Sequence, residues 1–167
     1  MKRHLTPITA SLLLCAGSLR AAADQAWLES YNIVWDSQSA DARGSMPIGA
    51  GNLGLNVWVE KDELLIYFGS PDSWSYRGPG FNTQMQTKLG RLRLKFAPVV
   101  WAKEFRQELE LASNSIVLSG KTSDGHAIKL RVWVDALQPV VRLEGQSDSP
   151  LEAVVSVEFP TGLAMAP

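Results

Sequence analysis

Hydrophobic and polar residues alternate with a period of two along most of the chain after Tyr31. The clearest stretch is 126–134, where isoleucine, leucine and valine fall on even positions while Lys129, Arg131 and Trp133 fall on odd ones. Successive side chains of a β-strand point to opposite faces of a sheet, so this pattern predicts a strand with one buried side. The same alternation predicts strands at 31–35, 54–60, 63–68, 91–96, 105–111, 115–120, 140–146 and 151–159.

Turn-forming residues separate these segments, as at Lys61-Asp62, Ser113-Asn114 and Asp124-Gly125. The pattern gives about nine strands and no convincing helix, so the strands must bury their apolar faces against each other. We therefore predict an all-β fold, an antiparallel β-sandwich.

Two longer segments interrupt the alternation, at 36–52 and at 69–88, and the second is rich in glycine, proline and serine. Loops of this length on a β scaffold usually bind a ligand or pack against a neighbouring domain. We expect both segments to be functional loops.

The chain begins with the arrangement of a secretory signal peptide. Lys2 and Arg3 precede an apolar stretch at 8–19, and three alanines follow at 21–23. A membrane anchor is the alternative, but Pro7 and Arg20 bound a stretch shorter than the ~20 apolar residues that a span requires. We predict a signal peptide at 1–23, a single domain at 24–167, no transmembrane segment, and export to the periplasm or the cell exterior.

Removing residues 1–23 takes away the only cysteine, Cys15, and leaves His126 as the only histidine. The remaining domain therefore has no disulfide and no multi-histidine metal site, and we expect neither metal nor cofactor. The whole chain has a net charge of −1, and the removed segment contains basic but no acidic residues. A mildly acidic surface argues against nucleic acid as the partner.

Gly49, Gly51 and Gly54 form the pattern G-x-G-x-x-G. As a dinucleotide-binding fingerprint this pattern needs a helix after it, whereas here an alternating strand follows. We interpret it as a turn that needs glycine for a positive φ or for close contact with a ligand or another chain.

All six tryptophans follow residue 23, and an aromatic face stacks well on a pyranose ring. Trp58 and Trp133 fall on the polar side of their strands, which makes them candidates for contact with sugar or with another domain. The alternative for each tryptophan is ordinary packing, because large aromatics dominate cores and interfaces.

Asp36, Asp41 and Asp72 fall in or beside the two long segments. Glycoside hydrolysis uses a pair of carboxyl groups ~5–9.5 Å apart, but loop aspartates more often cap turns through the local backbone. We interpret His126 as a surface residue at the start of a strand.

Several segments resemble the N-terminal β-sandwich of bacterial six-hairpin glycosidases. They read YNIVWD at 31–36, GSMPIGAGNLG at 44–54, NVWV at 56–59, DSW at 72–74 and KLGRL at 88–92. They are similar to the supersandwich-like domain of the α-L-fucosidases of glycoside hydrolase family 95, and to a related uncharacterised bacterial domain family. Ala50 departs from that pattern, which usually has asparagine there.

The resemblance implies an accessory sandwich of an exported glycoside hydrolase, with carbohydrate as the ligand and a C-terminal α/α barrel that carries the catalytic acid and base. No catalytic residue is then expected here, and these residues alone are predicted to be inactive. The resemblance places five residues on loops that face the substrate: Gly49, Gly51, Asn52, Asp72 and Trp74.

Two other functions are compatible with the same pattern. A free-standing carbohydrate-binding module would present coplanar exposed aromatics on one sheet face. A structural envelope domain without a ligand would have its long loops packed down and no cleft.

Overall fold

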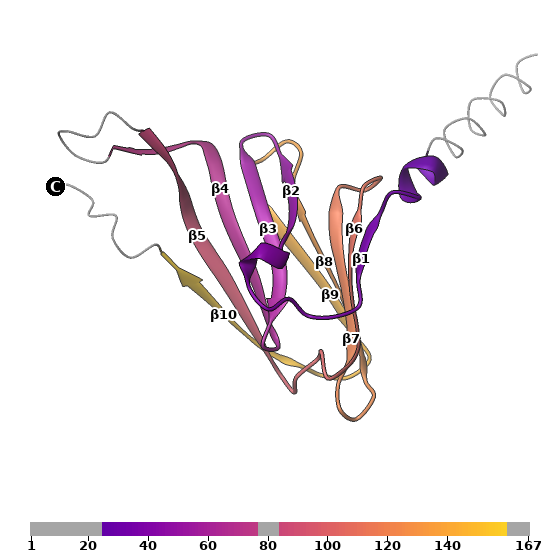
Figure 1. The fold of residues 1–167 in the computed structure, drawn as a ribbon. Coiled ribbons are helices and arrows are strands. Elements are labelled where there is room, and N and C mark those ends of the chain that lie inside the picture. The colour runs from indigo at the N-terminus through magenta and orange to yellow at the C-terminus, as the bar shows by residue number, and fades with distance from the viewer. Residues whose placement is uncertain (1–24, 77–83, 160–167) are drawn as a thin grey trace, which may run out of the picture.

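The computed structural model describes residues 25–76 and 84–159 (Figure 1). The predicted signal peptide lies outside these ranges. In the described part, ten strands form two antiparallel five-stranded sheets that pack face to face around a hydrophobic core. The predicted all-β sandwich is confirmed. Helical structure in these ranges is limited to a short turn at 25–29 and a 3₁₀ turn, η1 (Ala42–Gly44).

Each sheet combines a four-stranded meander with one strand from the other end of the chain. The first sheet has the order β10-β5-β4-β3-β2. Its strands are β2 (Met46–Ala50), β3 (Leu53–Glu60), β4 (Glu63–Tyr76), β5 (Gln84–Ala97) and β10 (Glu152–Glu158).

The second sheet has the order β1-β6-β7-β8-β9. Its strands are β1 (Ile33–Trp35), β6 (Lys103–Glu110), β7 (Ser115–Lys121), β8 (Ala127–Val134) and β9 (Val141–Ser147). The first strand, β1, pairs with β6 and so joins the sheet made by the later strands. The last strand, β10, pairs with β5 and so joins the sheet made by the earlier strands.

The two segments predicted to be loops contain more strand than the alternation indicates. Strand β2 lies inside 36–52, with Met46 and Ile48 buried and Pro47 exposed between them. A proline is tolerated there because β2 is an edge strand. Strands β4 and β5 also continue into 69–88, where they pair with each other as far as Tyr76 and Gln84. The loop prediction was therefore wrong for these residues.

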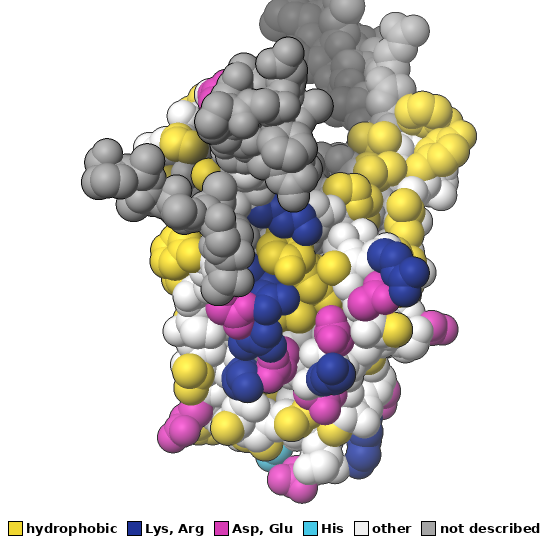
Figure 2. All heavy atoms as spheres, turned by 60° about the vertical axis from the view of Figure 1, so that its left-hand side comes forward, with side chains coloured by type: hydrophobic (Ala, Val, Ile, Leu, Met, Phe, Trp, Pro, Cys, Tyr) yellow, Lys and Arg dark blue, Asp and Glu magenta, His cyan; other side chains and the backbone are white. Residues whose placement is uncertain are grey.

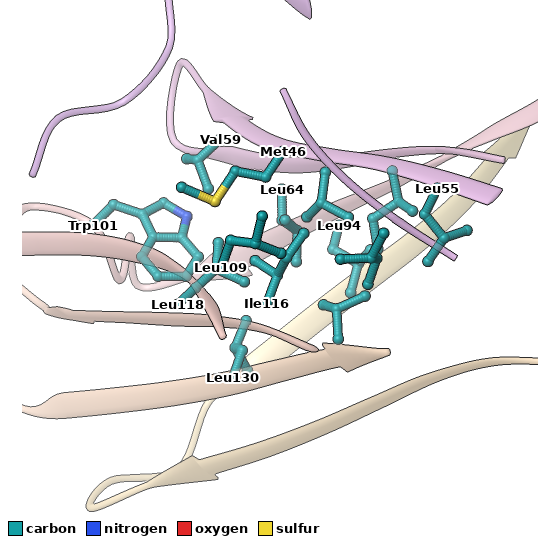
Figure 3. Close-up of a cluster of buried hydrophobic side chains, with 14 of the residues drawn as sticks. Met46, Leu55, Val59, Leu64, Leu94, Trp101, Leu109, Ile116, Leu118 and Leu130 are labelled. Carbon is teal, nitrogen blue, oxygen red and sulfur yellow. The ribbon is translucent and has the colours of Figure 1, made fainter. Parts of the chain in front are cut away.

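The core fills the space between the sheets (Figure 3). Met46 and Leu64 from the first sheet meet Ile116 and Leu130 from the second, as alternation places every second side chain inward. Trp101, in the β5–β6 connection, closes one end of the core and packs edge-on against Phe96 and Phe105.

Candidate functional site

The glycine motif forms the hairpin turn between β2 and β3. Ala50 pairs with Leu53, so Gly51 and Asn52 are the two turn residues, and Gly51 has a φ of 55°. Two-residue hairpin turns commonly place glycine where φ is positive. A strand follows the motif in place of a helix, as predicted, and the turn projects Asn52 from the end of the sandwich.

An irregular stretch of β4 brings Asp72 to the same end. The pairing with β5 shifts on both sides of Gly69, and residues 70–73 form a bulge. The Ser73 hydroxyl is within 2.7 Å of the carbonyl oxygens of Ser70 and Thr87, which fixes the bulge. The Asn52 side-chain amide donates to the Asp72 carboxylate at 3.4 Å. The two predicted loops therefore meet through these two residues.

A pocket of about 440 Å³ lies beside this pair, between the two sheets. Asn52 and Asp72 stand at its polar side, and the other walls are mainly apolar. The first sheet contributes Phe68, Leu89, Leu92 and Val157, and the second contributes Val141, preceded by Pro139. Of the predicted loop residues, Trp74 is 57% exposed and is not among the lining residues, nor are Gly49 and Gly51.

The pocket opens into an apolar edge of the sandwich, where β9 and β10 leave their inner faces uncovered. Val155 is 59% exposed and Val157 is 50% exposed, although both pair with core-facing leucines of β5. Leu143 of β9, which pairs with the buried Val132, is also exposed. We call Leu143, Val155 and Val157 the open edge. A glycosidase sandwich is expected to have an exposed apolar patch where its barrel docks, but alternation in these strands does not predict which inner-face side chains stay uncovered.

Trp58 lies on the outer face of the first sheet, as its alternation predicts, but it is buried there and is not exposed for contact with a sugar or another domain. Its side chain is 1% exposed, lies 5.1 Å from the ring of Tyr67, and donates from Nε1 to Glu60. The β1–β2 connection crosses this face, where the Ser39 amide donates to the Val59 carbonyl and η1 contacts β3.

Trp133 is half-buried on the outer face of the other sheet, with the Arg131 guanidinium 4.9 Å from its ring. Trp58 and Trp133 therefore belong to different sheets and do not form one aromatic platform.

Two of the candidate acids, Asp41 and Asp72, have different hydrogen-bond partners. Asp41 caps η1 and forms an ion pair with Arg43. Hydrogen bonds from the Arg43 side chain, and to a smaller extent from the Arg43 backbone N–H, hold the pKa of Asp41 below its ordinary value. The turn-capping interpretation is thus confirmed for Asp41. His126 directly precedes β8, is half-exposed, and lies 3.5 Å from Asp148, as expected of a surface residue at the start of a strand. In the described ranges no cluster of His, Cys, Asp and Glu could hold a metal ion.

A ladder of ion pairs crosses the outer face of the first sheet. Glu158 pairs with Arg91 and Arg93, while Glu63 pairs with Arg93 and Lys95. The pKa of Glu158 is lowered mainly by its hydrogen bond from Arg93 and next by the one from Arg91. The pKa of Glu63 is lowered mainly by its hydrogen bond from Lys95. In Figure 2, basic and acidic side chains alternate down one face beside a hydrophobic cluster.

The part of the sequence that forms the two sheets and the ion-pair ladder matches the model of a domain family. A family model described as "Domain of unknown function (DUF5703)", with the name DUF5703_N, matches residues 34–159. The chain belongs to this family. The DUF5703 match begins within β1 and runs through β10, so it includes both sheets and the pocket. No curated protein matches the sequence. Within the described residues, no helix is long and apolar enough to cross a membrane.

Proposed function

We propose that this DUF5703 domain is the N-terminal accessory β-sandwich of an exported glycoside hydrolase acting on polysaccharide or glycan. Its catalytic α/α barrel would lie outside these 167 residues. The open edge is the observation that carries the proposal. Apolar side chains on an inner sheet face are normally covered, and a contiguous exposed group of them marks an interaction site.

The pocket beside the open edge supports the same assignment. Asn52 and Asp72 place an amide and a carboxylate next to an apolar wall, at the end of the sandwich where the two loops meet. A barrel packed against the open edge would bring its own catalytic groups close to these loops. Asn52 and Asp72 would then shape the substrate entrance, while proton transfer would be left to carboxyl groups of the barrel.

The experiment compares the chain alone with a polypeptide extended through the reading frame that follows Pro167. Both are assayed for release of reducing sugar from a panel of polysaccharides. We expect hydrolysis from the extended polypeptide only. Hydrolysis by the chain alone, or inactivity of the extended polypeptide on every substrate, would contradict the proposal.

Two variants test the open edge in the extended polypeptide. Val157→Asp places a charge where the barrel would pack and should lower hydrolysis and the cooperativity of thermal unfolding. Val154→Asp is the matched control, because Val154 lies on the opposite face of β10 and is also exposed. Equal effects of the two substitutions would mean that the open edge is not the docking surface.

A further inference from the structure

The two sheets formed by the described residues have four edge strands, β1, β9, β2 and β10. An edge strand presents unpaired backbone N–H and C=O groups to any other strand, and proteins protect such edges by keeping them short or by placing proline in them. Strand β1 has only three residues, and β2 contains Pro47. Strands β9 and β10 each have seven residues without proline, so neither device protects them.

Strand β9 is accessible along nearly its whole length. Residues 142–147 are all exposed. Leu143 pairs with the buried Val132 of β8 and therefore belongs to the inner face, whereas Arg142 and Glu144 belong to the outer face. The edge of β9 thus combines an uncovered apolar side chain with a positive charge before it and a negative charge after it.

The negative charge of Glu144 is not neutralised by another described residue. None of the ion pairs found in the described ranges includes Glu144. Arg131 stands directly opposite on β8, but its Nε donates to the Ser115 hydroxyl and its guanidinium lies over the ring of Trp133. The Glu144 carboxylate is therefore left for a partner that pairs with β9.

The positive charge of Arg142 is held in a fixed orientation. Its Nε and Nη2 donate to the Asp135 carboxylate at 3.0 and 2.9 Å. Asp135 is itself fixed because it accepts from the backbone N–H groups of Leu137 and Gln138. These bonds orient the guanidinium and leave Nη1 to donate to a second carboxylate.

This charge pattern fits a second copy of β9. When two identical strands pair antiparallel about a two-fold axis, the residue on the axis meets its own copy. With Leu143 on the axis, Arg142 of each copy lies opposite Glu144 of the other. Opposite charges in directly opposed positions stabilise a strand pair, and like charges destabilise it. Placing Arg142 or Glu144 on the axis sets like charges against each other, so the charges select the register centred on Leu143.

Strand β10 does not have this property. In a self-pairing centred on Val155, Glu152 would lie opposite Glu158 of the second copy, and Glu158 already pairs with Arg91 and Arg93. Strand β9 is therefore the open edge strand whose sequence favours pairing with itself.

We infer that two copies of this chain associate through β9, antiparallel and centred on Leu143, so that the second sheet continues from one copy into the other. The paired strands supply backbone hydrogen bonds, Leu143 packs against its own copy, and two ion pairs between Arg142 and Glu144 form on the outer face. The inference does not depend on the proposed glycosidase function.

The test is sedimentation velocity of the purified chain from low micromolar to several hundred micromolar concentration. We expect a monomer that converts to a dimer as the concentration rises, because a two-fold pairing occupies the β9 edge of both copies. A monomer at every concentration, or growth beyond the dimer, would overturn the inference.

Charge exchange tests the register. Arg142→Glu and Glu144→Arg each set like charges opposite one another, and each should weaken dimerisation by about tenfold or more. The double variant restores both ion pairs with their charges exchanged, so its dimerisation should return toward that of the unchanged chain. Dimerisation that is unaffected by the single substitutions, or not recovered in the folded double variant, would overturn the inference.

Thermal unfolding checks the fold of these variants, because Arg142→Glu also removes the bonds to Asp135. Glu144→Arg leaves those bonds intact and decides the question if Arg142→Glu unfolds. The matched control is Glu152→Arg, which makes the same charge change at an exposed position of β10 and should leave dimerisation unchanged. Equal weakening by Glu152→Arg would assign the effect to net charge and overturn the inference. Barrel docking is tested at Val157 of β10, so its outcome is independent of these experiments.

Discussion

At the scale of single residues, buried polar groups and close-packed glycines are the positions where the fold tolerates least change. Gln107 of β6 is 1% exposed and donates from Nε2 to the carbonyl of Val57 in the opposite sheet at 3.1 Å. This hydrogen bond joins the two sheets through the core. A buried carbonyl that loses its donor cannot replace it with water, so the cost is the full desolvation of that group.

Gln107→Leu should therefore destabilise the domain by about 1–3 kcal/mol. Urea denaturation followed by tryptophan fluorescence measures the change. Gln146→Leu, at an exposed position on β9, is the matched control and should change stability little. Equal stability of the two variants would mean that the bond to Val57 contributes nothing.

A second prediction contrasts two glycines. The Cβ of alanine at Gly120 would lie 2.6 Å from the Val100 carbonyl oxygen, a backbone atom that cannot move aside. Gly120→Ala should lower the free energy of unfolding by about 1–3 kcal/mol. Gly69→Ala meets open space and should leave it unchanged or raise it by up to about 1 kcal/mol. A large loss of stability in Gly69→Ala would show that Gly69 is required for packing of the folded protein.

At the scale of elements, the edge strand β10 depends on both its backbone pairing and the ion-pair ladder. Its partner strand β5 supplies Arg91 and Arg93, which meet Glu158 at the end of β10. The pKa of Glu158 is lower in the folded protein than in the unfolded chain. The carboxylate therefore stabilises the fold above its unfolded pKa, and this contribution is lost as the pH falls through the folded value.

We expect the stability of the domain to fall as the pH drops below about 4.3, the ordinary pKa of glutamate, and to fall less steeply in Glu158→Gln. Thermal unfolding between neutral and acidic pH measures both slopes. Glu152→Gln changes the same residue type on the same strand, outside the ladder, and should retain the wild-type slope. If Glu158→Gln also keeps that slope, the ladder does not stabilise β10 through ionisation.

At the scale of the whole molecule, the sandwich is closed on one side and open on the other. Met46, Leu64, Ile116 and Leu130 are buried in the core between the two sheets, whereas side chains on the inner faces of β9 and β10 stay exposed at the open edge. Because the side chains of the open edge are only partly buried in this chain, replacing them should cost little stability. Their effect should appear in the binding of apolar molecules to the surface.

Val155→Lys combined with Val157→Lys should reduce binding of an apolar fluorescent dye while changing the free energy of unfolding by no more than about 1 kcal/mol. Dye fluorescence and urea denaturation measure the two effects. Val154→Lys, on the opposite face of β10, should leave the dye signal unchanged. A loss of several kcal/mol in the double variant would show that these valines are packed in the folded chain.

Much of the fold follows from local pattern. The alternation at 126–134 and the turn at Gly51-Asn52 both have the predicted form, because strand periodicity and positive φ are properties of adjacent residues. Strand β2 could not be predicted in this way. Its five residues include Pro47 and Gly49, and only pairing with β3 at the sheet edge makes them a strand.

Sequence alone determined the fold class, the turn chemistry and the inward-facing side of the core strands, because each depends on spacing of a few residues. Tertiary structure decided which residues meet across long separations. It buried Trp58 beneath the β1–β2 connection, joined Asn52 to Asp72, and aligned Gly54 with Gly69 beside Lys88. Those outcomes depend on register between strands and on what covers each face, which are set by the packing of the whole molecule and not by any one segment.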